Sequence, residues 1–182
     1  MLFGTFVPLP CVILAVVAAA IGAYTDFRRG HIPNWLTFGA LGLGVVLQAA
    51  FSESHAQGAL AALLGAFLCA IFPWVLFKRD AMGGGDVKLF AALGALLGAY
   101  HGIEAQFLAC CAATVFALAR LAWYGRLLSV MSNALFLGLN PLLPRRWKRD
   151  IAPDLLTKIR FGGGILAGTA IAALYTLPFS YL

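Results

Sequence analysis

Six long stretches of mostly apolar residues run through this sequence, and they constrain its fold more than any other feature. A helix that crosses a membrane needs about 17–25 predominantly apolar residues. On this basis we expect membrane spans over about residues 6–24, 35–51, 56–77, 89–102, 105–124 and 161–179. The second and fourth are short and must recruit flanking residues to cross the membrane. The predicted fold class is therefore all-α, a polytopic membrane protein with six transmembrane helices.

The composition agrees with a membrane protein and excludes several other classes. Of the 182 residues, 62% are hydrophobic and 11% are charged, and the mean hydropathy is +0.91. Soluble domains average about 45–50% apolar and about 25% charged residues. A soluble globular enzyme, a disordered tail and a disulfide scaffold are all incompatible with these values.

The basic residues predict how the chain is oriented in the membrane. It carries 13 Lys and Arg against 7 Asp and Glu. With six spans, all the basic residues fall on the same side. Because Lys and Arg are concentrated in cytoplasmic loops, we expect this side to face the cytoplasm and both chain ends to lie outside. The positive charge is thus explained by orientation in the cytoplasmic (inner) membrane, without nucleic-acid binding.

The sequence predicts a single membrane-embedded domain over residues 1–182, because no repeat or hinge divides it. Its one long connection, residues 125–160, is expected to be a cytoplasmic loop. Glycines four residues apart predict close helix packing in two spans. They are Gly94, Gly98 and Gly102 in the fourth span, and Gly164 and Gly168 in the sixth.

Two carboxylates lie where membrane helices begin or end. Asp26 falls in the last turn of the first span and Asp86 in the first turn of the fourth, so both are expected near the cytoplasmic surface. Ionisable residues at the membrane edge are costly and are therefore candidates for function. The structural alternatives are an ion pair of Asp26 with Arg28 or Arg29, and a helix cap or a Lys88 ion pair for Asp86.

The segments beside the two aspartates indicate a shaped site. The glycine run at 83–85 precedes Asp86, and such a run permits close approach of another backbone, for example an extended peptide. The alternative is a plain flexible turn. Pro33 and Asn34 form a rigid turn that opens the second span, which is equally a signal for the start of a helix.

A facing pair of carboxylates suits hydrolysis by acid–base catalysis. Like charges held close together cannot both ionise readily, so such a pair shares a proton. One carboxylate then activates a water while the protonated one hydrogen-bonds the scissile carbonyl. The dipoles of the two helices that carry them favour an ionised Asp86 and a protonated Asp26, although Arg28 and Arg29 oppose this assignment.

The two aspartate motifs resemble those of the type IV prepilin peptidase family, membrane aspartic peptidases with a GxGD motif. That family carries one Asp at the cytoplasmic end of its first core helix, followed by an IPN-type turn, and a second Asp in GxGDxKL. The matching segments here are Asp26 with residues 32–34, and residues 83–89. The resemblance implies that Asp26 and Asp86 are catalytic. Residues implied to bind substrate or shape the loops are Gly83, Gly85, Lys88, Pro33 and Asn34.

The same resemblance implies the substrate and the branch of the family. The expected partners are the lipid bilayer and a prepilin-like, pseudopilin-like or flagellin-like precursor, whose short basic leader is cut after Gly at the cytoplasmic membrane face. Larger members also N-methylate the product and carry a tetracysteine motif that is absent from this sequence. We therefore expect the small, peptidase-only branch (tight-adherence or preflagellin type). No metal or organic cofactor is implied.

Two other functions fit parts of the pattern. A presenilin-like intramembrane protease also uses GxGD, but it pairs this motif with a PAL motif that the sequence lacks. A non-enzymatic membrane transporter or assembly subunit would place its ionisable residues near the membrane midplane and show inverted repeats. Conservative Asp→Asn changes would separate an enzyme from a scaffold.

Overall fold

The computed structural model describes residues 7–123, 125 and 161–179, and these residues form helices and their connections, without a strand. The chain divides into two compact units, which are Met1–Ala113 with Arg160–Leu182, and Thr114–Ile159. Both aspartates lie in the first of these units. The predicted loop at 125–160 falls, apart from Gly125, outside the described residues.

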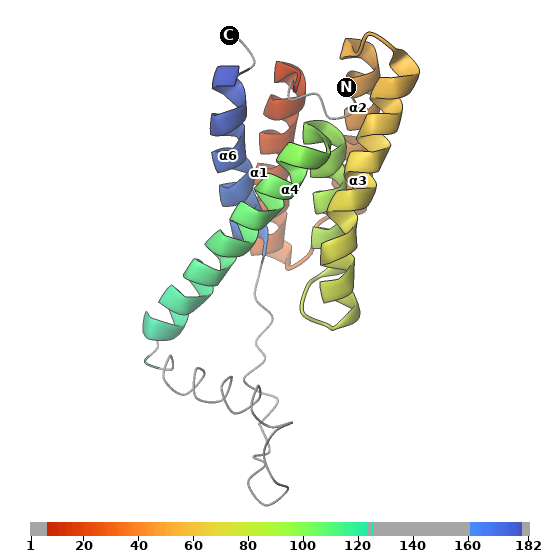
Figure 1. Ribbon diagram of the computed structural model, residues 1–182. Coiled ribbons are helices and arrows are strands. Elements are labelled where there is room, and N and C mark those ends of the chain that lie inside the picture. The colour runs from red at the N-terminus through yellow and green to blue at the C-terminus, as the bar shows by residue number, and fades with distance from the viewer. Residues whose placement is uncertain (1–6, 124, 126–160, 180–182) are drawn as a thin grey trace, which may run out of the picture. The chain divides into compact units, whose positions relative to one another are not determined.

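Five helices make up the described chain, and they confirm the all-α class. They are α1 (Leu9–Arg29), α2 (Asn34–Phe51), α3 (His55–Lys78), α4 (Gly84–Trp123) and α6 (Gly162–Phe179). Among the described residues, α1, α2, α3 and α4 are long and apolar enough to cross a membrane, and α6 contains a shorter apolar stretch. Within the first unit, α1 lies beside α2 and α6, and α2 lies beside α3 (Figure 1).

The predicted fourth and fifth spans differ most from the structure. We expected their boundary at residues 102–105, but α4 is helical there and its backbone breaks at Gly98 instead (φ 75°, ψ 173°). That region of backbone conformation is essentially confined to glycine. The break is supported from α2, where the Gln48 side-chain amide donates to the Leu96 carbonyl at 2.9 Å. Gly98 is therefore a bend, and its role in packing was wrongly predicted.

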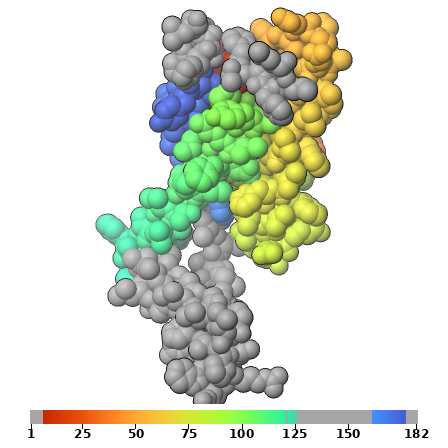
Figure 2. All heavy atoms as spheres, in the orientation of Figure 1, coloured from red at the N-terminus to blue at the C-terminus, as the bar shows by residue number. Residues whose placement is uncertain are grey.

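The other four glycines of the predicted packing motifs lie where helices approach closely. A Cβ on Gly94 would overlap the Gly65 carbonyl of α3, and one on Gly102 would lie 2.7 Å from the Cys69 sulfur. Cβ atoms on Gly164 and Gly168 of α6 would collide with the backbone of α4 at Ala109. The space-filling view shows the green middle part of α4 lying against the yellow α3 (Figure 2).

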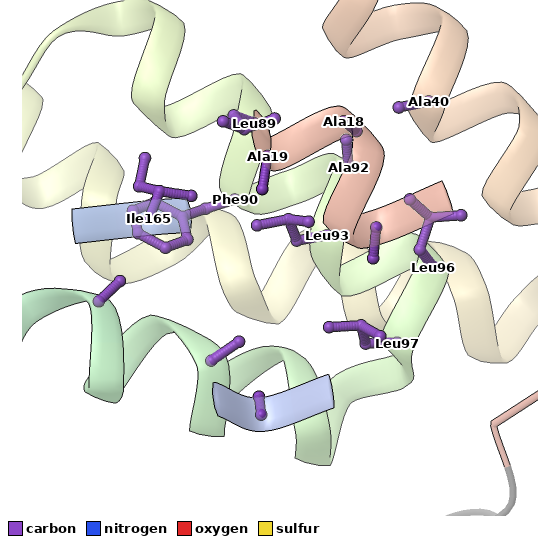
Figure 3. Packing of buried hydrophobic residues seen from close by; sticks show 14 of the residues in the cluster. Ala18, Ala19, Ala40, Leu89, Phe90, Ala92, Leu93, Leu96, Leu97 and Ile165 are labelled. Atoms are coloured by element: carbon purple, nitrogen blue, oxygen red, sulfur yellow. The ribbon is translucent and has the colours of Figure 1, made fainter. Parts of the chain in front are cut away.

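The first part of α4 supplies the large side chains of the buried core. Leu89, Phe90 and Leu93 are at most 1% exposed. They pack against small residues of α1 such as Ala19, and against Ile165 of α6 (Figure 3). Large apolar side chains instead lie on the outer surfaces of α1, α2 and α3. Small residues on the inner faces of α1, α2 and α3, with large apolar residues on their outer faces, are the pattern expected for helices that pack closely in lipid.

Candidate active site

Asp26 and Asp86 come from different helices and are brought near each other by the bundle. Asp26 lies in the last turn of α1 and is half-buried, whereas Asp86 lies in the first turn of α4 and is 8% exposed. The two carboxylates are close enough for their charges to repel each other. The predicted juxtaposition of two residues 60 positions apart is therefore present in the fold.

The end of α1 is fixed by local hydrogen bonds on both sides of Asp26. The Thr25 hydroxyl donates to the Ile21 carbonyl at 2.9 Å. Gly30 follows the helix in the left-handed conformation (φ 70°), and its N–H donates to the Asp26 carbonyl at 2.9 Å. A glycine in this conformation is a common way to end a helix. The backbone of the last turn is thereby fixed, and with it the point from which the Asp26 side chain extends.

Asp86 is held by the first turn of its own helix. The Gly83 carbonyl accepts the Asp86 N–H at 3.1 Å, and the Gly83 backbone N–H donates to the Asp86 carboxylate. An acidic side chain that reaches back over the first turn in this way forms half of a capping box. Its other oxygen, Oδ1, is buried and has no hydrogen-bond partner among the described residues. One carboxylate oxygen is thus held while the other is unengaged.

Asp26 has a partner that the sequence analysis missed. The backbone N–H of Gly162, at the start of α6, donates to Asp26 Oδ2 at 3.2 Å. Asp26 therefore lies at the C-terminus of α1 and also at the N-terminus of α6. The N-terminus of α6 favours an anion at Asp26. It therefore opposes the protonated Asp26 predicted from the dipoles of α1 and α4 alone. The only sequence signal for this contact was the glycine run at 162–164.

The predicted loop-shaping residues connect the start of α2 with the start of α4. Pro33 immediately precedes α2, as expected for a helix start. The Lys88 ammonium donates to Asn34 Oδ1 at 2.8 Å. A Cβ on Gly85 would lie 3.0 Å from the Ile32 Cβ, so this glycine lets the two segments approach closely. The neighbour of Gly83 is not Ile32 but the Asp86 side chain.

The ion pairs that would have given the aspartates a structural role are absent from the described residues, where the one ion pair is His101–Glu104. Arg28 lies over the Tyr24 ring, 5.6 Å from its centroid, and makes no ion pair with Asp26. Lys88 binds Asn34 and not Asp86. The carboxylates are therefore held mainly by backbone amides, an arrangement that leaves their charges free of a neutralising side chain.

The fold and the site together define a polytopic membrane protein with an acidic pair at the ends of two helices. The chain matches the model of the type IV leader peptidase family over residues 11–118. This match covers more than half of the chain and includes both aspartates, so the chain belongs to this family.

Two curated relatives are similar to part of the chain. Prepilin peptidase EppA of Methanothermobacter thermautotrophicus is 37% identical over 93 residues, which are 50% of this chain and 24% of the relative. The prepilin leader peptidase/N-methyltransferase of Vibrio cholerae is 35% identical over 80 residues, 40% of this chain and 30% of the relative. The matched part thus spans less than a third of either relative. A comparison with solved structures found no match.

Proposed function

We propose that the protein is a membrane aspartic endopeptidase that removes the short basic leader of a prepilin-like precursor. The observation that carries this proposal is the pair of mutually repelling carboxylates, Asp26 and Asp86, neither of which has an ion-pair partner among the described residues. Membership of the type IV leader peptidase family and the names of the two relatives support the same reaction.

The pair can hydrolyse a peptide bond without a covalent intermediate. One carboxylate, ionised, takes a proton from water as the water oxygen attacks the scissile carbonyl carbon. The other, protonated, gives its proton to the carbonyl oxygen. When the carbon–nitrogen bond breaks, the first group returns its proton to the leaving amine, and the second group regains its proton from a hydroxyl of the tetrahedral intermediate. The buried and unengaged Oδ1 of Asp86 is suited to contact the substrate or the water in this reaction.

We further propose that the chain crosses the inner membrane six times, with both ends outside and the aspartates at the cytoplasmic face. The bend at Gly98 supports two spans within α4, and α6 would supply the sixth. In this orientation Arg28, Arg29 and Lys88 lie beside the site on the cytoplasmic side, as the positive-inside rule predicts. Cleavage would follow the Gly that ends the leader.

A cleavage assay in cells tests this function. A prepilin-like precursor is co-expressed with the wild type, Asp26→Asn or Asp86→Asn, and leader removal is followed by the mobility shift and the mass of the product. We expect cleavage by the wild type and at least about a 100-fold loss in both variants, because each removes a group that transfers protons.

Asp80→Asn is the matched control for this assay. Asp80 lies in the connection before α4 with φ 56°, a conformation that asparagine adopts readily, so its charge can be removed without backbone strain. It should retain wild-type cleavage at equal protein levels. Cleavage by Asp26→Asn or Asp86→Asn would refute the acidic pair. Failure of the wild type on several precursors would favour the transporter or assembly alternative.

A further inference from the structure

The first turn of α6 is held rigidly against the helix that carries Asp26. The Ile165 N–H donates to the Phe161 carbonyl at 2.9 Å, which closes this turn. Ile165 is fully buried in the core, and Phe161 packs against the same core. A Cβ on Gly164 would lie 2.8 Å from the Ala109 carbonyl of α4. The backbone amides of this turn therefore have little freedom to move relative to α1 and α4.

Gly162 is the residue through which α6 reaches Asp26. A Cβ at this position would lie 2.9 Å from both the Cβ and Oδ2 of Asp26, and 3.1 Å from the Ala23 Cα. Only glycine lets the backbone approach this closely. Its N–H donates to Asp26 Oδ2 at 3.2 Å. The next residue differs, since a Cβ on Gly163 would meet no atom within 4 Å.

We propose, resting on the proposed function, that Gly162 is a positioning residue of the active site. Its backbone N–H fixes one oxygen of the Asp26 carboxylate, so that the other oxygen is directed to the reactants. Asp86 is held in a similar way by the Gly83 amide. Each aspartate of the pair is thus oriented by one backbone N–H at a helix N-terminus. Such fixed donors need no rearrangement during the reaction.

Two substitutions separate the hydrogen bond from the steric fit. Gly162→Ala keeps the N–H but adds a Cβ, whereas Gly162→Pro adds a Cβ and also removes the N–H. Proline is well tolerated in the first turn of a helix, where its missing N–H breaks no bond within the helix. Gly163→Ala and Gly163→Pro make the same changes one residue further along and serve as matched controls.

The variants are compared in purified form by their steady-state cleavage of a precursor. We expect kcat of Gly162→Pro to be about 10-fold to 100-fold below that of the wild type, the usual effect of losing a hydrogen bond to a charged group. Gly162→Ala, which weakens the bond without removing the donor, should lower kcat less. KM should be similar in the two variants, because the amide contacts Asp26 and not the substrate. The two Gly163 variants should differ from each other by less than about 3-fold. Wild-type kcat for Gly162→Pro would overturn the proposal.

A second measurement needs no enzymatic activity. In a chain with its four cysteines replaced, Asp26→Cys with Gly162→Cys should form a disulfide in native membranes. The two Cβ positions lie 2.9 Å apart and need to separate by only about 1 Å to reach the usual disulfide spacing. Asp26→Cys with Gly163→Cys should not. No disulfide in the first pair would overturn the positioning role. Failure of the wild type to cleave any precursor would instead refute the proposed function, whichever way the cross-linking result falls.

Discussion

At the scale of single residues, the two aspartates differ in what surrounds them. Asp86 is buried at the start of its own helix, and one of its oxygens has no partner in the described chain. Asp26 is half-buried and accepts a hydrogen bond from a different helix. Both are positioned by main-chain amides at glycines. Substitutions at these glycines therefore act on the site through the backbone.

Gly85 offers a direct test of how closely the site must be packed. A Cβ there would lie 3.0 Å from the Ile32 Cβ and 3.3 Å from the Ile32 backbone nitrogen, so Gly85→Val must displace the turn that carries Asp86. We expect kcat for precursor cleavage to fall by about 10-fold to 100-fold, because misplacement by about 1 Å can cost that much. Gly42→Val is the control, since nothing lies within 4 Å of its Cβ position. Equal activity of the two variants would contradict this packing.

The aspartates could be predicted from the sequence, whereas Gly162 could not. Asp26 and Asp86 stand out because few other acidic residues occur and because both fall at predicted helix ends. Gly162 acts through its N–H, which nearly every residue has. Its role depends on α6 lying against α1 (Figure 1), and the glycine run at 162–164, the only sequence signal for that contact, does not reveal which residue reaches Asp26.

At the scale of the elements, α4 determines the architecture of the site. Its first turn carries Asp86, the turns that follow supply the core leucines, and its backbone bends at Gly98. Hydropathy predicted α2, α3 and α6 to within one residue at each end, but it ended the first span at residue 24, whereas α1 continues to Arg29. It also placed the interruption of α4 at the wrong residues. Glycines at spacing four look alike in the sequence whether they pack helices or interrupt one. Only the backbone angles of Gly98 distinguish the two.

The bend at Gly98 predicts a cost for any side chain there. With φ 75° and ψ 173°, Gly98→Ala should destabilise the protein by about 1–3 kcal/mol. Gly42→Ala is the matched control, because this glycine lies within α2 with open space around it and alanine favours a helix. Thermal unfolding in detergent provides the comparison. If Gly98→Ala proves as stable as the wild type, the bend is not an obligatory feature of α4.

At the scale of the whole molecule, small residues hold the helices of the first unit together while large apolar residues face outward. Gly65 of α3 and Gly94 of α4 lie so close that a Cβ on either would overlap the carbonyl of the other. Lipid is as apolar as the interior of such a bundle, so close packing, rather than exclusion of water, stabilises it. Volume added between helices should therefore be far more harmful than volume changed on the outer surface.

This difference can be measured on one helix. Gly65→Val should separate α3 from α4 and destabilise the protein by at least about 1–3 kcal/mol, the usual cost of overpacking. Leu63→Val changes a neighbouring side chain that is 51% exposed, and it should shift stability by less than about 0.5 kcal/mol. Protease resistance in native membranes reports both effects. A Leu63→Val variant as unstable as Gly65→Val would contradict the proposed outward face of α3.

The central claim is that Asp26 and Asp86 together perform hydrolysis, and Asp26→Asn tests it most directly. Asparagine can still accept the hydrogen bond from Gly162 and cap α6 as well as aspartate does, but it cannot transfer the proton. The measurement is the kcat of purified, reconstituted Asp26→Asn on a prepilin-like precursor, beside its thermal stability. We predict wild-type stability with kcat lowered at least about 100-fold. A stable variant that cleaves at the wild-type rate would reduce Asp26 to a helix cap and contradict the acidic pair.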